Sequence, residues 1–362
     1  MASPSRLVLA PFGVAYGVAV RARLALYRAG LLKVYGAGVP VVSVGNITAG
    51  GTGKTPLVEW LARALATGAA RRVCVLTRGY ARADEGRRVI VSDGQTLSAG
   101  AREGGDEPRL LAERLLADKV AVVCDADRVA ASRWARENLR SEVFILDDGF
   151  QHLRLARDLN VVTLDATDPW GGGRLLPAGR LREPPSGLAR ADCVVITRAE
   201  LCGDIAGLKS RAARLSGGRP VHVARTVVRG VRELSREASD ESAAPQARTP
   251  REPLFAFCAV GNPGAFFAQL RREGYGVGRE RAFKDHHSYT QSDADSLSRE
   301  AERAGGRSLV TTAKDAVKLR DLRFGLPCYV LEIGLSFDEE DALLELVLRV
   351  VRRGRADQFR VE

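Results

Sequence analysis

A glycine-rich segment between a strand pattern and a helix pattern is the feature that most constrains the fold of this chain. Residues 41–45 (VVSVG) are apolar and typical of a strand, and residues 46–55 (NITAGGTGKT) follow directly. Pro56 then opens an amphipathic helical pattern, and proline suits a first helical turn. This order is typical of a phosphate-binding loop, in which backbone amides and a helix N-terminus surround phosphate oxygens.

The residues of this loop predict a nucleotide site. We expect the nucleotide to be bound by Thr48, Ala49, Gly50, Gly51, Thr52, Gly53, Lys54 and Thr55. Lys54 is expected to reach the terminal phosphates of ATP, and Thr55 to ligate Mg²⁺. The usual pattern begins with a glycine where this chain has Thr48, and the additional glycines make the loop a variant.

Short apolar runs that alternate with helical patterns predict the fold class. The runs rich in Val and Ile are residues 40–45, 72–77, 119–124, 143–147, 160–164 and 192–197. Helical spacing is present at residues 56–66, 108–116 and 128–138. Such alternation favours right-handed βαβ units, so we expect an α/β fold with a P-loop-containing, doubly wound, mostly parallel sheet.

The length of 362 residues predicts more than one folded unit. Residues 232–252 are polar and contain two prolines, as in a linker or an exposed excursion. Strand patterns resume at 254–260, 308–312 and 328–332, with helical patterns at 263–273 and 339–352. We therefore expect an N-terminal helix in residues 1–35, the P-loop domain in 36–230, a linker or excursion in 231–253, and a second, smaller α/β domain in 254–362.

The N-terminus is both cationic and apolar. Residues 7–20 carry no charge, and arginines flank this stretch. It is shorter than the roughly 20 residues of a membrane-spanning helix, and it lacks a convincing cleavage site for a signal peptide. Two alternatives stay open, an interfacial membrane anchor and a helix that packs on its own domain.

The net charge of +11 suits nucleic acid, an anionic membrane surface or phosphorylated substrates. No stripe of alternating aromatic and basic residues favours nucleic acid, so we expect no such partner. The six cysteines mostly lie in apolar strand patterns without metal-ligand spacing, which predicts buried free thiols. With only four histidines, any metal should be bound by oxygen atoms.

Two further segments carry candidate chemistry. Asp147 and Asp148 end an apolar strand pattern, where a carboxylate can hold Mg²⁺ against nucleotide phosphates. Asp106 precedes a helical pattern, and its local sequence predicts a helix N-cap. Residues 168–184 are rich in glycine and proline and carry three arginines, which is plausible for a loop that grips an anionic substrate. Residues 283–289 and 311–318 add polar clusters to the second domain.

Together these segments resemble the tetraacyldisaccharide 4'-kinase family of lipid A synthesis. The matching segments are the loop, residues 104–108 (GGDEP), 147–152 (DDGFQH), 170–179 (WGGGRLLPAG), 78–80 (RGY), 181–183 (LRE), 285–287 (DHH) and 314–318 (KDAVK). The resemblance spans almost the whole chain. One departure is Ala313, where the family's pattern leads us to expect a glutamate.

The resemblance implies a lipid kinase that uses ATP and Mg²⁺ to phosphorylate the 4'-hydroxyl of a tetraacyl glucosamine disaccharide 1-phosphate. Its partners would be this lipid A disaccharide precursor and the inner-membrane surface. It would be a monotopic enzyme on the cytoplasmic face of the bacterial inner membrane, with residues 1–35 as a membrane-associating helix. We expect a monomer.

The resemblance also assigns roles to residues. Asp106 matches the family's proposed general base, which replaces the helix-cap interpretation, and His286 is its expected partner, with His287 as the alternative. The other catalytic residues would be Lys54, Asp147 and Asp148, and which aspartate ligates Mg²⁺ beside Thr55 is open. The expected substrate-binding residues are Arg78, Gln151, His152, Arg174, Arg182 and Glu183.

Two rival functions remain as alternatives. A P-loop GTPase or ATPase of the metallochaperone type is one, because residues 197–200 (TRAE) follow a strand where a guanine-reading Thr-Lys-x-Asp would stand. Arg198 and Glu200 make a poor copy of that motif. A basic nucleic-acid or membrane-binding module that uses ATP only structurally is the other, and steep salt dependence of DNA binding would favour the nucleic-acid form.

Overall fold

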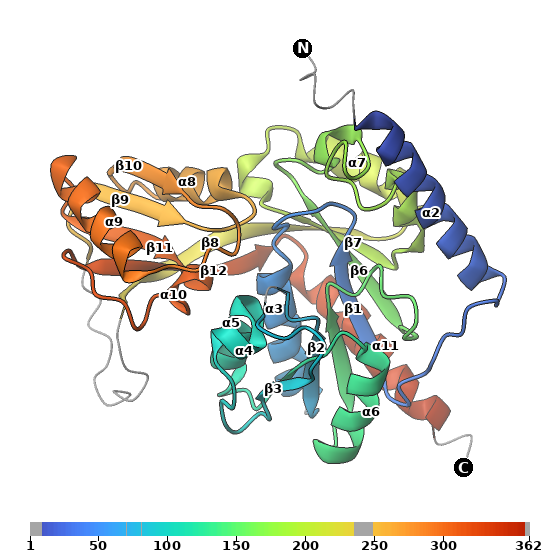
Figure 1. Ribbon diagram of the computed structural model, residues 1–362. Helices are drawn as coiled ribbons and strands as arrows, with labels where there is room; N and C mark the ends of the chain where they lie inside the picture. The colour runs from blue at the N-terminus through green and yellow to red at the C-terminus, as the bar shows by residue number, and fades with distance from the viewer. Residues whose placement is uncertain (1–8, 70, 81, 235–248, 359–362) are drawn as a thin grey trace.

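The computed structural model describes residues 9–69, 71–80, 82–234 and 249–358, in which one mixed sheet carries helices on both faces (Figure 1). In spatial order its strands are β10 (Val277–Ala282), β9 (Leu254–Cys258), β11 (Ser308–Thr312), β12 (Cys328–Phe337), β8 (Val221–Glu233), β7 (Cys193–Thr197), β6 (Leu159–Asp165), β1 (Val41–Asn46), β5 (Val143–Asp147), β2 (Val73–Thr77), β4 (Ala121–Cys124) and β3 (Val89–Ser92). Neighbours are parallel except β12 with β8 and β3 with β4. The predicted α/β class with a mostly parallel sheet is confirmed.

Strands β7 to β3 form the P-loop half, whose core has two apolar layers. In β2, Val73 and Val75 face one layer while Cys74 and Leu76 face the other, as a period of two requires. The first layer is covered by α3 (Lys54–Gly68), α5 (Asp106–Leu115) and α11 (Glu340–Gln358), and the second by α6 (Arg128–Asn138) and α7 (Ile205–Leu215). Because the central strands are buried on both faces, their sequences are mostly apolar and do not alternate with exposed polar residues.

Strands β9, β10 and β11 form the outer half, which repeats this arrangement on a smaller scale. The helix α8 (Pro263–Arg272) packs on one face through Phe267 and Leu270, and α9 (Gln291–Arg303) packs on the other through Leu297 and Ala301. The shorter elements are α4 (Ala101–Gly104), α10 (Ala313–Ala316), η1 (Gly171–Gly173), η2 (Pro185–Arg190) and η3 (Ala199–Leu201).

The long strand β8 joins the two halves. Its first residues pair with β7, and from Ala224 onward it pairs with the antiparallel β12 as far as Glu233. The predicted boundary at residue 230 therefore falls inside a strand that continues to Glu233. Most of the predicted linker, residues 235–248, lies outside the described residues.

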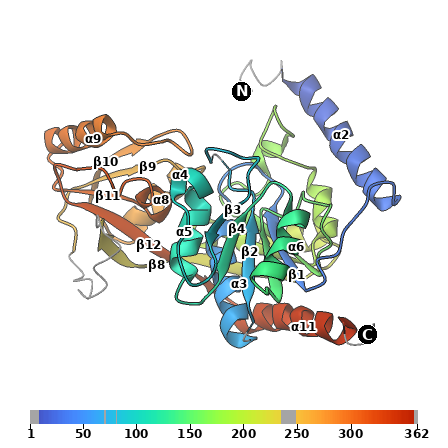
Figure 2. The same cartoon turned by 60° about the horizontal axis from the view of Figure 1, so that its bottom comes forward.

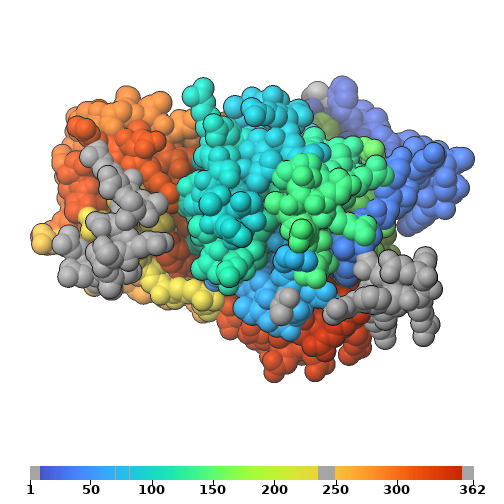
Figure 3. Space-filling view, turned by 90° about the horizontal axis from the view of Figure 1, so that it is seen from below, coloured from blue at the N-terminus to red at the C-terminus, as the bar shows by residue number. Residues whose placement is uncertain are grey.

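The C-terminal helix corrects one expectation. The sequence places residues 339–352 in the second domain, whereas α11 lies against α3 of the P-loop half (Figures 2 and 3). Leu343, Val347 and Val351 are buried in the layer that also contains Leu57 and Leu61. The cause is the direction of β12, which runs antiparallel to β8 and so returns the chain to the P-loop half.

The N-terminal helix α2 (Ala10–Arg28) packs on residues 175–178 through small side chains. A Cβ atom on Gly17 would lie 2.6 Å from Leu175 Cδ1, so the absence of a side chain at Gly17 lets the helix approach this segment closely. Away from this contact, Phe12, Val14 and Val18 are 62%, 65% and 54% exposed. Of the helices that the structure describes, none has the length and apolar character to cross a bilayer.

Candidate active site

The phosphate loop connects β1 to α3 in backbone conformations that glycine adopts at little cost. Gly50 has a φ of +106°, and Gly53, just before the first residue of α3, has a φ of +75°. No side chain among the described residues caps the N-terminus of α3. The free N–H groups of the first helical turn and the helix dipole therefore favour a bound anion at this position.

Hydrogen bonds of threonine hydroxyl groups hold the phosphate loop in place. Thr52 Oγ1 accepts a hydrogen bond from Asn46 Nδ2 at 2.8 Å and lies 3.0 Å from Thr163 Oγ1 on β6. Thr197 Oγ1 at the end of β7 donates to the carbonyl of Thr52 at 2.8 Å. Thr48 is itself buried, so it supports the loop while the residues after it line the cleft.

Two arginines hold the loop from its sides. Arg180 Nε donates to the carbonyl of Ala49 at 3.0 Å, and Arg198 Nη1 donates to that of Gly51 at 2.8 Å. Arg180 is one of the three arginines of residues 168–184 for which the sequence suggests an anionic substrate, and its guanidinium lies on the phosphate loop, 3.2 Å from Asp168 Oδ2. Arg198 is also paired with the buried carboxylate of Asp165, so both arginines serve mainly to fix the loop's position.

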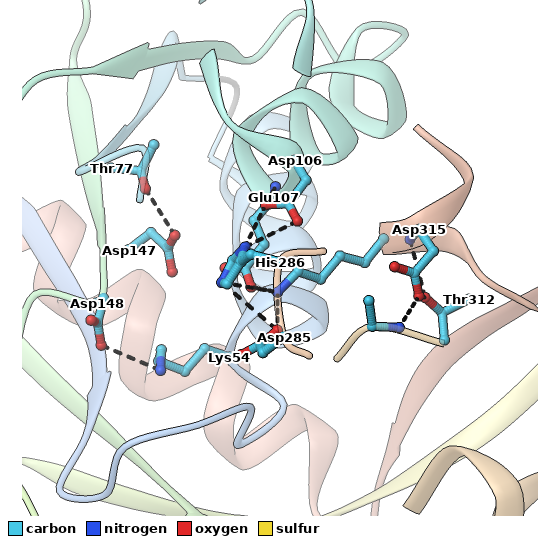
Figure 4. Close-up of polar contacts among 12 residues, drawn as sticks. Lys54, Thr77, Asp106, Glu107, Asp147, Asp148, Asp285, His286, Thr312 and Asp315 are labelled. Carbon is cyan, nitrogen blue, oxygen red and sulfur yellow. Dashed lines mark hydrogen bonds and ion pairs between the residues drawn. The ribbon is translucent and has the colours of Figure 1, made fainter. Parts of the chain in front are cut away.

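Lys54 and Asp148 form an ion pair beside the loop (Figure 4). Lys54 Nζ lies 3.3 Å from Asp148 Oδ1, and Arg182 Nη1 donates to both oxygens of the same carboxylate at 2.8 and 2.7 Å. Burial alone would raise the pKa of Asp148, but these two cations hold it well below its usual range. Asp148 also has a positive φ of 53°, a costly conformation that such contacts can hold in place.

Asp147, the last residue of β5, has the opposite electrostatic environment. Its carboxylate is buried and accepts a hydrogen bond from Thr77 Oγ1 at 3.1 Å. Burial, with the charges of Glu107 and Asp148, raises the pKa of Asp147 to about 6. A cation beside this carboxylate would offset the cost of its charge.

Asp147, Asp148 and Thr55 fit a Mg²⁺ site in which the phosphates of a nucleotide supply further ligands. Mg²⁺ is commonly held by one or two carboxylates together with substrate phosphates and waters. Asp147 ends β5, Asp148 follows it directly, and Thr55 lies in the first turn of α3, and all three line the same cleft. Among the described residues, no three or more His, Cys, Asp or Glu side chains form a cluster that could hold a metal ion without other ligands.

Asp106 and His286 bring the two halves together (Figure 4). His286 Nδ1 lies 3.1 Å from Asp106 Oδ2 and 3.2 Å from Oδ1, whereas His287 contacts Asp293 instead. The local N-cap interpretation of Asp106 is wrong, because Gly105 occupies the cap position and Asp106 begins the helix. Of the two histidines that the sequence leaves open, His286 is therefore the one in contact with Asp106.

The surroundings of this pair shift the pKa values of both partners. Burial alone would raise the pKa of Asp106, but the hydrogen bond from His286 and the charges of Lys314 and Lys318 lower it to about 2. The same hydrogen bond raises the pKa of His286 above its usual value. Asp106 is therefore a carboxylate at neutral pH, and His286 keeps its proton to a higher pH than a free histidine does.

Lys314 and Lys318 are site residues to which the sequence analysis gives no role. Lys314 Nζ lies 2.7 Å from Glu107 Oε1 and 3.3 Å from Asp285 Oδ1, and Lys318 Nζ lies 3.5 Å from Asp106 Oδ2. Their spacing of four residues is the signal that could have linked them, although Lys318 lies just after α10. Only the fold shows that both side chains reach the residues at the start of α5.

Comparison with known proteins gives the family of the chain. A sequence profile described as Tetraacyldisaccharide-1-P 4'-kinase matches residues 5–352. The chain belongs to the tetraacyldisaccharide-1-P 4'-kinase family. Two similar proteins are both named tetraacyldisaccharide 4'-kinase. One, from Geobacter metallireducens, is 43% identical over 91% of this chain and 94% of its own length, and the other, from an Anaeromyxobacter species, is 44% identical over 98% and 95%.

The fold agrees with this 4'-kinase family. The crystal structure of an "apo" form of LpxK from Aquifex aeolicus in complex with ATP matches with a TM-score of 0.75 and 33% identity. The match covers 96% of this chain and 99% of that one.

A cleft of about 940 Å³ between the two halves gathers most of the site residues expected of a 4'-kinase. Its walls include the phosphate loop, Asp106, His286 and the adjacent Asp147 and Asp148. Of the expected substrate-binding residues, it is lined by Arg78, Gln151, His152 and Arg182. Burial lowers the pKa of His152 to about 4, so its ring is neutral at neutral pH and can exchange hydrogen bonds with a sugar.

Two residues expected to bind the 4'-kinase substrate lie elsewhere. Arg174 is exposed and does not line the cleft. Glu183 is only 1% exposed and accepts a hydrogen bond from Gln151 Nε2 at 2.6 Å. Glu183 therefore orients Gln151 from behind the cleft, a position that strand and loop patterns do not reveal.

Proposed function

We propose that this protein transfers the γ-phosphoryl group of ATP to the 4'-hydroxyl of a tetraacyl glucosamine disaccharide 1-phosphate in lipid A synthesis. The observation that carries the proposal is the Asp106–His286 pair in the same cleft as the phosphate loop. An ATPase positions a water molecule at the γ-phosphate, whereas a kinase needs a group that positions an acceptor hydroxyl there, and Asp106 can serve as that group. Membership of the 4'-kinase family supports the choice of acceptor.

The phosphate loop would bind the triphosphate. Its amides and Lys54 hold the phosphate oxygens, and Lys54 exchanges its contact with Asp148 for the nucleotide. Thr55 and Asp147 or Asp148 would hold Mg²⁺, which when bound neutralises charge on the phosphates. Freed from Lys54, Asp148 keeps the bidentate contact with Arg182.

Asp106 would position the sugar hydroxyl and accept its proton. A carboxylate with a pKa of about 2 is a weak base, yet phosphoryl transfer through a loose transition state asks mainly for alignment of the attacking oxygen. His286 orients that carboxylate from the outer half, and Lys314 keeps it ionised. Catalysis therefore depends on both halves.

The lipid substrate would be met at a membrane surface. The exposed side chains of Phe12, Val14 and Val18 and the flanking arginines suit a helix that lies in the interface. We therefore propose a peripheral enzyme on the cytoplasmic face of the inner membrane, acting as a monomer. We also propose the division into 1–35, 36–230, 231–253 and 254–362, with α11 and the end of β8 as the departures noted above.

Product analysis tests the acceptor assignment. Incubation with ATP, Mg²⁺ and the disaccharide 1-phosphate in mixed micelles should add one phosphate, which phosphorus–proton NMR correlation should place at the 4'-position. The matched control is the 4'-deoxy disaccharide, which should gain none. Phosphorylation of the 4'-deoxy compound, or phosphate at another position, would reject the assignment.

A further inference from the structure

A buried carboxylate of the outer half, Asp315, takes no part in the proposed mechanism. Asp315 is 0% exposed, and neither it nor the nearby Lys318 lines the cleft. Taking a carboxylate out of water is costly unless charges and hydrogen bonds compensate. The four-residue helix α10 needs no buried charge to begin, because the hydroxyl of Thr312 caps it by accepting from the N–H of Asp315 at 3.1 Å. The burial of Asp315 therefore serves something beyond the helix start.

One oxygen of Asp315 holds the backbone that carries His286. Asp315 Oδ2 accepts hydrogen bonds from the N–H of Ala259 at 3.0 Å and from Thr312 Oγ1 at 2.8 Å (Figure 4). Ala259 directly follows β9, and its carbonyl accepts from the N–H of His286 at 3.3 Å. His286 has a positive φ of 61°, a conformation that costs free energy and persists where neighbouring contacts impose it. The carboxylate thus acts on His286 through a single residue.

The other oxygen of Asp315 holds the ammonium group of Lys318. Asp315 Oδ1 lies 3.2 Å from Lys318 Nζ. The same ammonium lies 3.5 Å from Asp106 Oδ2 and 5.3 Å from the centre of the buried Tyr289 ring. The backbone N–H of Lys318 also donates to the carbonyl of Asp315 at 2.9 Å, so one turn of the chain fixes both residues. Two carboxylates and an aromatic face therefore hold this cation in place.

These contacts form a closed ring that includes Asp106. One path runs from Asp315 through Ala259 to the backbone of His286. The imidazole of His286 then lies 3.1 Å from Asp106 Oδ2. The other path runs from Asp315 through Lys318 to the same oxygen of Asp106. A carboxylate that is contacted from two sides has one preferred orientation, and alignment of an acceptor hydroxyl requires such an orientation.

We propose that Asp315 is a positioning residue of phosphoryl transfer. It holds His286 and Lys318 in place, and these two side chains orient the carboxylate of Asp106 toward the acceptor hydroxyl. The inference rests on the proposed function, in which Asp106 receives the proton of the sugar hydroxyl. Because Asp315 and Lys318 do not line the cleft, they act through Asp106 and touch neither the nucleotide nor the sugar. Their loss should therefore lower kcat and leave the KM for ATP unchanged.

Single variants of the full chain test this role. Asp315→Asn keeps the size of the side chain but removes the charge opposite Lys318, and Lys318→Met keeps the length of the side chain but removes the ammonium. Transfer of labelled phosphate from ATP to the disaccharide 1-phosphate should show kcat about 10-fold lower in each, with an unchanged KM for ATP. Lys318→Arg, which keeps the charge, should recover part of the loss. The matched controls are Asp321→Asn and Arg299→Met at exposed positions, which should keep the wild-type kcat.

Double variants show whether the two residues act through Asp106. When Asp106→Asn is already present, adding Asp315→Asn or Lys318→Met should cause no further loss of kcat, because the group that they position is gone. A further loss of about 10-fold on that background, or wild-type kcat in both single variants, would overturn the inference and leave the kinase proposal intact. A wild type that transfers no phosphate would overturn the kinase proposal and this inference with it. Lys318→Met decides the outcome if Asp315→Asn does not fold.

Discussion

At the scale of single residues, the carboxylates of the site have different pKa values because their surroundings differ. Asp147 is buried with other acids near it, which raises its pKa to about 6 and suits a ligand of a cation. Asp106 is also buried, but a histidine and two lysines surround it, and its pKa falls to about 2. In the proposed function, the same residue type would bind the metal in one place and position the hydroxyl in the other.

The coupling of Asp106 to His286 predicts a measurable change in titration. The hydrogen bond to Asp106 is the main cause that raises the pKa of His286, while burial and Lys314 act to lower it. Asp106→Asn should therefore lower the pKa of His286, because it removes the main cause that raises this pKa. NMR titration of the four histidine rings measures this directly.

The sign of the effect on stability follows from the same shift. A histidine whose folded pKa is raised stabilises the fold below its unfolded pKa of about 6.5, and this contribution is lost as the pH rises through the folded pKa. Asp293→Asn, which removes a contact of His287, is the control and should leave the titration of His286 unchanged. If His286 titrates alike in wild type and Asp106→Asn, the coupling does not exist.

Individual residues differ in how far the sequence foretells their place. The loop residues around Lys54 are contiguous, so a local pattern is sufficient to predict their arrangement. Asp106 is different, because its local sequence predicts a helix cap and its contact with His286 spans 180 positions of the chain. Arg174 lies at the surface and Glu183 lies in the interior. Tertiary packing decides both positions, and the local sequence does not reveal it.

At the scale of elements, α2 combines a glycine side that packs on the protein with apolar side chains that do not. Replacing Val14 and Val18 by Asp should weaken binding to anionic vesicles by roughly 10-fold or more, because each buried valine contributes about 1.5 kcal/mol and a charge opposes insertion. Vesicle flotation measures this. Thr67→Asp, at an exposed position of α3, is the control. Equal flotation of all three proteins would show that α2 serves only the fold.

The position of α11 gives a prediction on stability. Leu343 is fully buried in the layer shared with α3, so Leu343→Ala should lower the free energy of unfolding by about 2–5 kcal/mol. Glu345→Ala on the exposed side of the same helix should stay within about 0.5 kcal/mol of wild type. Urea unfolding compares the two, and equal midpoints would mean that α11 does not pack in this layer.

The elements that sequence patterns reveal are those buried on both faces. Strands β1, β2, β5 and β7 are mostly apolar, and each lies within one or two residues of its expected position. The strand β10 has the sequence VGRERA, in which charges hide any strand pattern, and β8 alternates apolar residues with arginines. Both are recognisable only from their pairing with β9 and β12.

At the scale of the whole molecule, the reaction site is divided between two halves of one sheet. The phosphate loop and Asp106 belong to the P-loop half, while His286 and Lys314 come from the outer half. Cross-contacts of opposite charge, such as Lys314 with Glu107 and Arg320 with Glu113, hold these halves together. Part of the chain's positive charge therefore forms ion pairs between the halves, and part lies where it can attract the anionic reactants.

The measurement that tests the account most directly is transfer of labelled γ-phosphate from ATP to the disaccharide 1-phosphate in mixed micelles, with ATP affinity measured in parallel. Wild type should transfer phosphate, and Lys54→Ala and Asp106→Asn should each lose a factor of about 100 or more. Only Lys54→Ala should bind ATP more weakly, because Asp106 meets the acceptor. Full transfer by Asp106→Asn, or no transfer by a wild type that binds ATP, would contradict the proposed division of the site.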